Sequence, residues 1–306
     1  MAKDKNLFNE LFPIVLMGGL FVIIHFLSLL LVWPFDNAGM QAFEETDNPT
    51  NLIYIFIILL VMTAAILLIA RFWKKQVIQV IILGAIGYTS FWVFRPIINF
   101  ILPWSFAIII SALLAVVLIF ILYKYPEWYV IDISGIIVGA GAIAIFGISL
   151  GILLVIILLV GLAVYDAISV YKTKHMIDLA DTVMDLKLPV LLVVPKIRKY
   201  SFIKETKRLK EKLEEGVERE AFFMGLGDIV MPGILVVATY TNIDNSLPIA
   251  LSVMIGTLFG FAVLMAFVMK GKPQAGLPCL CGGAIAGYVV SSLLLFGELR
   301  GLTFSF

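Results

Sequence analysis

Two acidic residues lie inside apolar stretches of this sequence, where a carboxylate is costly to bury. Asp166 stands in "GLAVYDAISVYK" and Asp228 in "FFMGLGDIVMPG". Ionisable residues within membrane-spanning segments are rare, face the interior of a helix bundle and mark functional sites. Two neighbouring carboxylates tend to share one proton, which leaves one base and one acid. Such a pair can hydrolyse a peptide bond, because one carboxylate activates water while the other protonates the carbonyl.

Other uses of these residues remain open from their positions alone. A hydrogen bond between two helices would require no chemistry from them. A proton- or ion-coupled transporter or channel would employ the same buried carboxylates as relay groups.

The composition defines the solvent that surrounds the elements carrying these acids. Of 306 residues, 62% are hydrophobic and 14% charged, and the mean hydropathy is +1.08. These values are far outside the range of soluble domains and indicate a polytopic, all-α membrane protein. No basic face interleaved with aromatic residues points to nucleic acid. The Cys279 and Cys281 pair lacks the ligand count of a zinc site, and no metal or cofactor is expected.

Nine apolar runs approach the length of about twenty residues that crosses a bilayer. The fifth and sixth are nearly continuous, and we divide them at "FGISLG", where glycines allow a turn. The predicted spans are Phe12–Trp33, Leu52–Ala70, Val77–Phe94, Ser105–Tyr123, Trp128–Phe146, Leu150–Tyr171, Ala221–Tyr240, Pro248–Met269 and Leu277–Phe296.

Basic residues predict the orientation, because cytoplasmic loops carry the excess of lysine and arginine. With the N-terminus in the cytoplasm, all but two of the 22 basic residues lie inside, the exceptions being Arg95 and Arg300. Nine crossings then place the C-terminus outside. The chain is expected in the cell membrane as a multi-pass protein.

A charged segment divides the chain into three parts. Residues 172–220 form a predicted cytoplasmic loop between a six-helix part, 1–171, and a three-helix part, 221–306. Within the loop, Lys207 with Glu211 and Lys210 with Glu214 have the i,i+4 spacing of a solvated helix. The preceding "LKLPVLLVVPK" is too short to span a membrane and has the β-branched content of an extended segment.

Depth brings the two acids together. Asp166 lies about 9 Å above the cytoplasmic boundary of the sixth span, and Asp228 roughly 13 Å into the seventh, at 1.5 Å per residue. The helices are consecutive and antiparallel, so the carboxylates have similar depth. His25 lies within the first span, and Asp132 is interpreted as an acid that snorkels to the interface near Trp128.

Three short motifs accompany these acids in chain order. "YD" contains Asp166, "GLGD" ends at Asp228, and "AGLP" opens the ninth span. With this order and this placement on nine helices, the sequence resembles the presenilin and signal peptide peptidase family of GxGD intramembrane aspartyl proteases. It looks most similar to an archaeal presenilin homologue. "AGLP" departs from the family's Pro-Ala-Leu-Pro motif at Ala275 and Gly276 and keeps Leu277 and Pro278.

The resemblance implies an aspartic endopeptidase that cleaves within transmembrane helices in the lipid bilayer. It implies Asp166 and Asp228 as the catalytic pair and no requirement for accessory subunits. The residues of the catalytic motif would be Tyr165, Gly225, Leu226 and Gly227, and those that bind substrate would be Gly276, Leu277 and Pro278. Residues Leu188 to Pro195, with "AGLP", are expected to give strand-type hydrogen bonds to an unwound substrate.

A serine-protease interpretation is weaker. "GISLG", Gly147 to Gly151, matches a nucleophile pattern, but it falls in an outer turn and only two histidines exist to serve as its base. The transporter or channel remains the alternative function, although the chain shows no repeat of the kind that inverted-symmetry transporters have.

Overall fold

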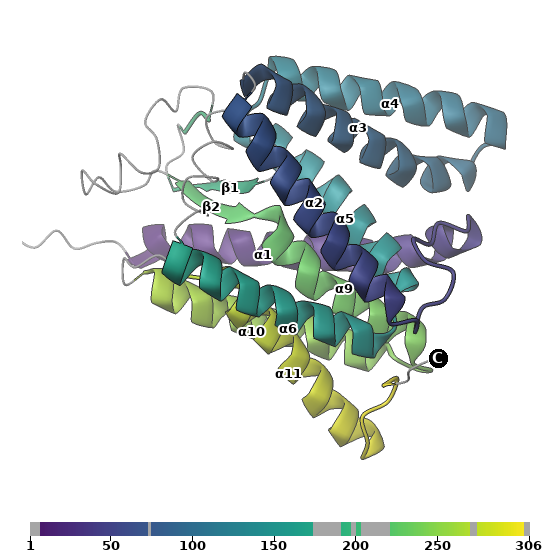
Figure 1. The fold of residues 1–306 in the computed structure, drawn as a ribbon, viewed down its shortest axis with the longest axis vertical. Coiled ribbons are helices and arrows are strands. Elements are labelled where there is room, and N and C mark those ends of the chain that lie inside the picture. Colours follow the sequence, from purple (N-terminus) through teal and green to yellow (C-terminus); the bar gives the residue numbers. More distant parts are fainter. Residues whose placement is uncertain are drawn as a thin grey trace, which may run out of the picture.

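The described part of the protein is a bundle of α-helices with a small two-stranded antiparallel β-sheet at one end (Figure 1). The computed structural model describes residues 7–72, 75–173, 191–196, 200–202, 221–269 and 274–302. In these residues the helices are α1 (Leu7–Asn37), α2 (Thr50–Phe72), α3 (Lys75–Asn99), α4 (Trp104–Lys124), α5 (Trp128–Ser149), α6 (Ile152–Ile168), α9 (Leu226–Asn242), α10 (Leu247–Val268) and α11 (Gly276–Phe296). A short π-helical turn, η1 (Ser169–Thr173), continues α6. The paired charges expected at 207–214 lie outside the described residues.

Seven of the helices are long and apolar enough to cross a membrane, and the described part also has shorter apolar helical stretches at Thr50–Ala65 of α2 and in α9. The predicted break between the fifth and sixth spans is confirmed, because α5 ends at Ser149 and α6 begins at Ile152. An all-α, polytopic membrane architecture is therefore present, with the two-stranded sheet as its one departure in the described residues.

The seventh predicted span begins differently from the prediction. Residues Ala221–Gly225 form strand β2, which pairs antiparallel with β1 (Leu191–Pro195), and helix α9 starts only at Leu226. The pairing aligns Leu191 with Gly225 and Pro195 with Ala221. The apolar residues "AFFMG" are compatible with a helix, but their pairing with β1 makes them a strand. The extended form expected for the segment around β1 is confirmed at Leu191–Pro195.

Two helices form the centre of the bundle. Helix α5 packs against α1, α3 and α9, and α9 also contacts α6, α10 and α11. In the apolar window of α5, 61% of residues are buried, whereas 22% are buried in α4. Since apolar side chains that do not face protein face lipid, α4 is a lipid-exposed helix and α5 an interior one.

Helices α10 and α11 approach until their backbones touch. A Cβ atom built at Gly256 would lie 2.2 Å from the carbonyl oxygen of Gly283, and one built at Gly283 would lie 2.2 Å from the carbonyl oxygen of Gly256. Small residues permit this contact, which is a common basis of helix association in membranes. The contact fixes α11, whose first turn reaches the two aspartates.

Candidate active site

Asp166 lies in the last turn of α6 and faces the start of α11. Its side chain is 3% exposed. The backbone N–H of Leu277 donates a hydrogen bond to Oδ2 of Asp166 at 3.1 Å. The predicted "YD" and "AGLP" motifs therefore meet in the folded chain.

The first turn of α11 explains why this carboxylate is held there. The opening N–H groups of a helix have no partner within the helix, and acidic groups near this end are favourable. Ala275, the N-cap residue, provides no side-chain cap, so Asp166 takes that role from another helix. Pro278 fits in the same turn, because a proline at that position removes no intrahelical hydrogen bond.

Asp228 stands in the first turn of α9, immediately after β2. A Cβ atom at Gly276 would lie 3.1 Å from Oδ2 of Asp228, and one at Gly225 would lie 3.4 Å from it. The carboxylates of Asp166 and Asp228 are near enough to interact electrostatically. The start of α11 thus contacts both acids. Within the described residues, the Asp228 carboxylate makes no hydrogen bond.

The remaining residues of the predicted motif have different surroundings. Leu226 packs against α5, where a Cβ atom at Gly139 would lie 3.1 Å from its Cδ1. A Cβ atom at Gly227 would have nothing within 4 Å, so this glycine faces open space beside Asp228. The side chain of Tyr165 is 59% exposed and does not turn toward the bundle interior. Leu226 therefore anchors the turn, and Gly227 leaves its outer side uncovered.

Asp132 is buried, and its interpretation as an interfacial acid is wrong. Its side chain is 6% exposed, and Oδ1 accepts a hydrogen bond from the backbone N–H of Val193 at 2.8 Å. Val193 belongs to β1, so helix α5 occupies the edge of β1 that faces away from β2. Asp132 therefore joins the two-stranded sheet to the helix bundle. The role of Asp132 is visible only in the folded structure, because α5 and β1 are far apart in sequence.

His25 has a role that the sequence analysis did not assign. It is fully buried in α1, and Nε2 donates to the carbonyl oxygen of Ile229 at 3.1 Å. Ile229 directly follows Asp228 in α9. Pro232, four residues after Asp228 in the same helix, has no N–H to donate to the carbonyl of Asp228, so α9 has one hydrogen bond fewer at this turn. A histidine within an otherwise apolar run was the available signal.

The serine pattern "GISLG" has a structural role. Ser149 at the end of α5 donates to the carbonyl of Ile145 and accepts a hydrogen bond from the backbone N–H of Ala42 at 2.7 Å. Neither bond involves a histidine. Ser149 therefore ties the segment after α1 to α5, and the serine-protease interpretation finds no support at this position.

Comparisons with known proteins agree with a site built from two aspartates. Residues 18–297 match the family model described as signal-peptide peptidase, presenilin aspartyl protease. The chain is similar to two crystal structures of a presenilin family intramembrane aspartate protease. The C222 form has 35% identity and a TM-score of 0.70, with 92% of this chain and 99% of that chain covered. For the P2 form, identity is 37%, the TM-score is 0.67, and coverage is 91% and 96%. No curated protein sequence matches the chain.

Proposed function

We propose a catalytic mechanism for this chain, which belongs to the signal-peptide peptidase and presenilin family of aspartyl proteases. It is a multi-pass membrane protein and an intramembrane aspartic endopeptidase, and transmembrane proteins in the bilayer are its substrates. Nothing found supports the transporter or channel alternative. The observation that carries the proposal is the contact of two carboxylates, the buried Asp166 from α6 and the partly buried Asp228 from α9, with the glycine-containing first turn of α11.

Asp166 and Asp228 are the catalytic pair in this mechanism. The Leu277 N–H at the start of α11 favours the ionised form of Asp166, whereas Asp228 accepts no hydrogen bond in the described residues, so we assign Asp166 as the base and Asp228 as the acid. Asp166 takes a proton from water as the water oxygen bonds to the scissile carbonyl carbon. Asp228 gives its proton to the carbonyl oxygen. In the tetrahedral intermediate Asp166 then gives its proton to the nitrogen, and Asp228 takes back a proton from a hydroxyl group as the C–N bond breaks. This step releases the amine and the carboxylic acid and restores both aspartates.

A substrate helix must unwind before this reaction, since its carbonyls are engaged in i to i−4 bonds. Each group left without a partner in lipid costs several kcal/mol. The sequence analysis expected the replacement bonds from Leu188 to Pro195, around β1, and from "AGLP". We keep "AGLP" but assign the strand-type bonds to β2 in place of β1, because β1 is bonded to β2 on one side and to Asp132 on the other.

The register indicates which groups of β2 are available. In an antiparallel pair, residues alternate between exchanging backbone bonds with the partner and pointing them away. Because the N–H of Val193 points away toward Asp132, its partner Phe223 also points its N–H and C=O away from β1. Gly225, two residues on, does the same. A substrate strand along this edge would run directly to Asp228, with Gly276 to Pro278 opposite.

A proline at position 223 tests the strand. Phe223→Pro removes the outward N–H but leaves the bonds to β1, and proline is tolerated at such an edge. The control is Phe223→Leu, which keeps the N–H and an apolar side chain beside Phe202. Cleavage of a transmembrane substrate is expected to fall at least about tenfold in the proline variant relative to the leucine variant, as one backbone bond is lost. Equal rates would contradict the strand assignment.

The proposed topology has nine crossings, with the N-terminus in the cytoplasm and the C-terminus outside. It rests on the confinement of basic residues to one set of loops. The chain divides into 1–171, the cytoplasmic loop 172–220, and 221–306. A reporter active only outside the cell, fused after residue 306 and separately after residue 173, should be active in the first fusion alone.

We further propose that no accessory subunit is required, since both acids and the α11 turn belong to one chain. Detergent-purified protein is incubated with a fluorogenic transmembrane peptide and nothing else. Cleavage that is lost in both Asp166→Asn and Asp228→Asn supports the proposal. Uptake of ions into vesicles without any cleavage would contradict it and favour a transporter.

A further inference from the structure

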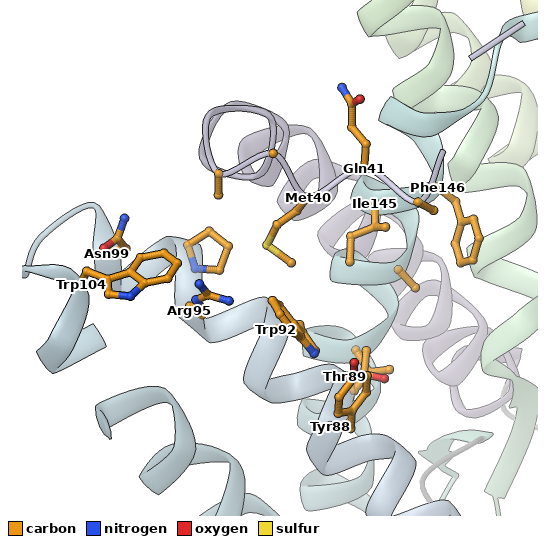
Figure 2. Close-up of a pocket in the computed structure, with 16 residues that line it drawn as sticks. Met40, Gln41, Tyr88, Thr89, Trp92, Arg95, Asn99, Trp104, Ile145 and Phe146 are labelled. Atoms are coloured by element: carbon orange, nitrogen blue, oxygen red, sulfur yellow. The ribbon is translucent and has the colours of Figure 1, made fainter. Parts of the chain in front are cut away.

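A cavity far from the aspartates lies between the C-terminal halves of α3 and α5. It has a volume of about 650 Å³ and is lined by α3, α5, the segment 38–42 after α1, and the first residue of α4. Neither Asp166 nor Asp228 lines it. Figure 2 shows Met40 from that segment and Ile145 from α5 across the cavity from the α3 side chains. Its walls are mainly apolar and aromatic.

One cation enters this apolar space. The guanidinium of Arg95 lies over the ring of Trp104 at 3.8 Å and near that of Trp92 at 5.0 Å. Figure 2 shows it between these two rings. No carboxylate lies within salt-bridge distance of it among the residues that the structure describes. Stacking on aromatic faces orients an arginine but leaves its N–H groups free for an anion.

Arg300 provides an internal comparison. It also stacks on an aromatic ring, that of Phe296 at 4.4 Å. Unlike Arg95, it has an acidic partner, because its Nε donates to Glu298 at 3.1 Å. The two residues were the only basic ones assigned to the outer side from sequence. One of them is thus neutralised within the protein, and the other is not.

A second donor, buried beside the cavity, is also unused. The indole Nε1–H of Trp92 is buried and has no hydrogen-bond acceptor in the described part of the chain. Buried indole N–H groups usually find a partner. Arg95 is four residues before the end of α3, about 6 Å along the helix, a depth at which side chains meet lipid headgroups. The cavity therefore combines an unpaired cation and an apolar wall at the membrane interface, and an unused donor is buried behind that wall.

We propose that this cavity binds the phosphate group of a membrane phospholipid on Arg95, with an acyl chain along the apolar wall. An anionic headgroup satisfies the unpaired guanidinium, for which a phosphate is geometrically suited. The acyl chain of the lipid covers residues such as Ile145 and Phe146, which would otherwise border an empty apolar space. The site lies at the opposite end of the bundle from the acids and has no part in peptide hydrolysis.

Native mass spectrometry after release from phosphatidylglycerol nanodiscs tests the proposal. Wild-type protein is expected to retain one phospholipid, and Arg95→Gln to retain at least about tenfold less. Arg300→Gln, which removes the paired arginine, should retain as much as wild type. Ala142→Leu, which fills the cavity while keeping Arg95, should also lose the lipid, so a folding defect in one variant does not decide the result.

Other occupants give different outcomes. If wild-type and Arg95→Gln protein retain lipid equally, the site is overturned. If millimolar inorganic phosphate stabilises wild-type protein in detergent but not Arg95→Gln, and no lipid is retained, the cavity binds a free anion instead. If Arg95→Gln slows cleavage only of substrates with an acidic outer segment and leaves lipid retention unchanged, the cavity receives substrate, and the lipid proposal is also wrong.

Discussion

The α5–β1 junction and the α6–α9–α11 junction both bury an aspartate that accepts a backbone N–H. Asp132 accepts from Val193 at 2.8 Å, and Asp166 accepts from Leu277 at 3.1 Å. The two side chains are similarly buried. At the first junction the acid stands alone and fastens a strand. At the second, Asp228 lies beside it, and glycines leave the backbone accessible. Burial therefore does not distinguish the two junctions, and the proposed catalytic role of the second rests on its second carboxylate and its uncovered approach.

The largest expected effect comes from asparagine at the paired acids. Asp166→Asn can still accept the Leu277 N–H but cannot take a proton, and Asp228→Asn cannot donate one. Each should lower the rate of peptide cleavage by about 10³-fold or more, in line with the size of acid–base contributions. Thermal unfolding in detergent should change little, because the shape of the side chain is kept.

Asp132→Asn is the matched control, since it makes the same chemical change at the first junction. It also retains an acceptor for Val193 and should cleave at a rate within about threefold of wild type, as no catalytic proton is lost. Turnover with a fluorogenic transmembrane peptide measures all three variants. Equal losses at positions 132, 166 and 228 would remove the distinction between the junctions.

The next effect concerns the α11 turn that contacts both acids of the pair. In Gly276→Ala the new methyl would lie 3.1 Å from Oδ2 of Asp228, closer than most real contacts, so the carboxylate must shift. Small misplacements of reacting groups cost up to about 10²-fold in rate. We expect a loss of roughly 10- to 100-fold in kcat.

Gly282→Ala is the control in the same helix, because a Cβ atom there meets nothing within 4 Å. It should leave kcat unchanged. Quantified cleavage of one substrate over a range of concentrations separates kcat from KM. A Gly276→Ala enzyme with wild-type kcat would show that the α11 turn does not position Asp228.

Removal of the acceptor at the first junction should act on stability instead of chemistry. Asp132→Ala leaves the Val193 N–H buried without a partner, at a cost of about 1–3 kcal/mol. We expect a lower unfolding temperature and a moderate loss of cleavage as β1 and β2 loosen. Asp132→Asn should restore both. A full loss of activity in Asp132→Ala with unchanged thermal stability would instead give Asp132 a chemical role.

Much of this arrangement was accessible from the sequence, and the exceptions have physical causes. The helices follow from apolar runs because hydropathy is a local property, and the break at "FGISLG" follows from glycine. The strand at Ala221–Gly225 was missed, since its five apolar letters fit a helix equally well and only pairing with β1 decides the matter. The same holds for Asp132, whose partner Val193 is 61 residues away.

At the paired acids, the sequence analysis predicted proximity from depth on consecutive helices. It did not predict that the N–H group of Leu277 would donate to Asp166, because helix α11 reaches that position through its contact with α10. His25 on α1 was noted but had no assigned partner. Its bond to the carbonyl of Ile229 joins residues 204 positions apart, which no local pattern encodes.

The smallest expected effect isolates the approach of the substrate. Gly227 lies beside Asp228, and a Cβ atom there would touch nothing in the described residues, so Gly227→Ala should disturb no contact within the protein. Alanine also favours the helical turn by about 0.5–1 kcal/mol over glycine. The variant should therefore unfold at the same temperature or slightly above it.

Any loss of cleavage in Gly227→Ala must then come from a substrate backbone that passes over this position. We expect KM for a transmembrane peptide to rise about three- to tenfold, as expected for a displaced backbone contact, with kcat nearly unchanged. Gly84→Ala, which also adds a methyl group in open space but lies on α3, should leave KM unaltered. Wild-type KM in Gly227→Ala would mean that the substrate reaches the acids from the side of Gly276 alone. The open side of the pair would then serve access of water, and the paired junction would differ from that of Asp132 by its second carboxylate only.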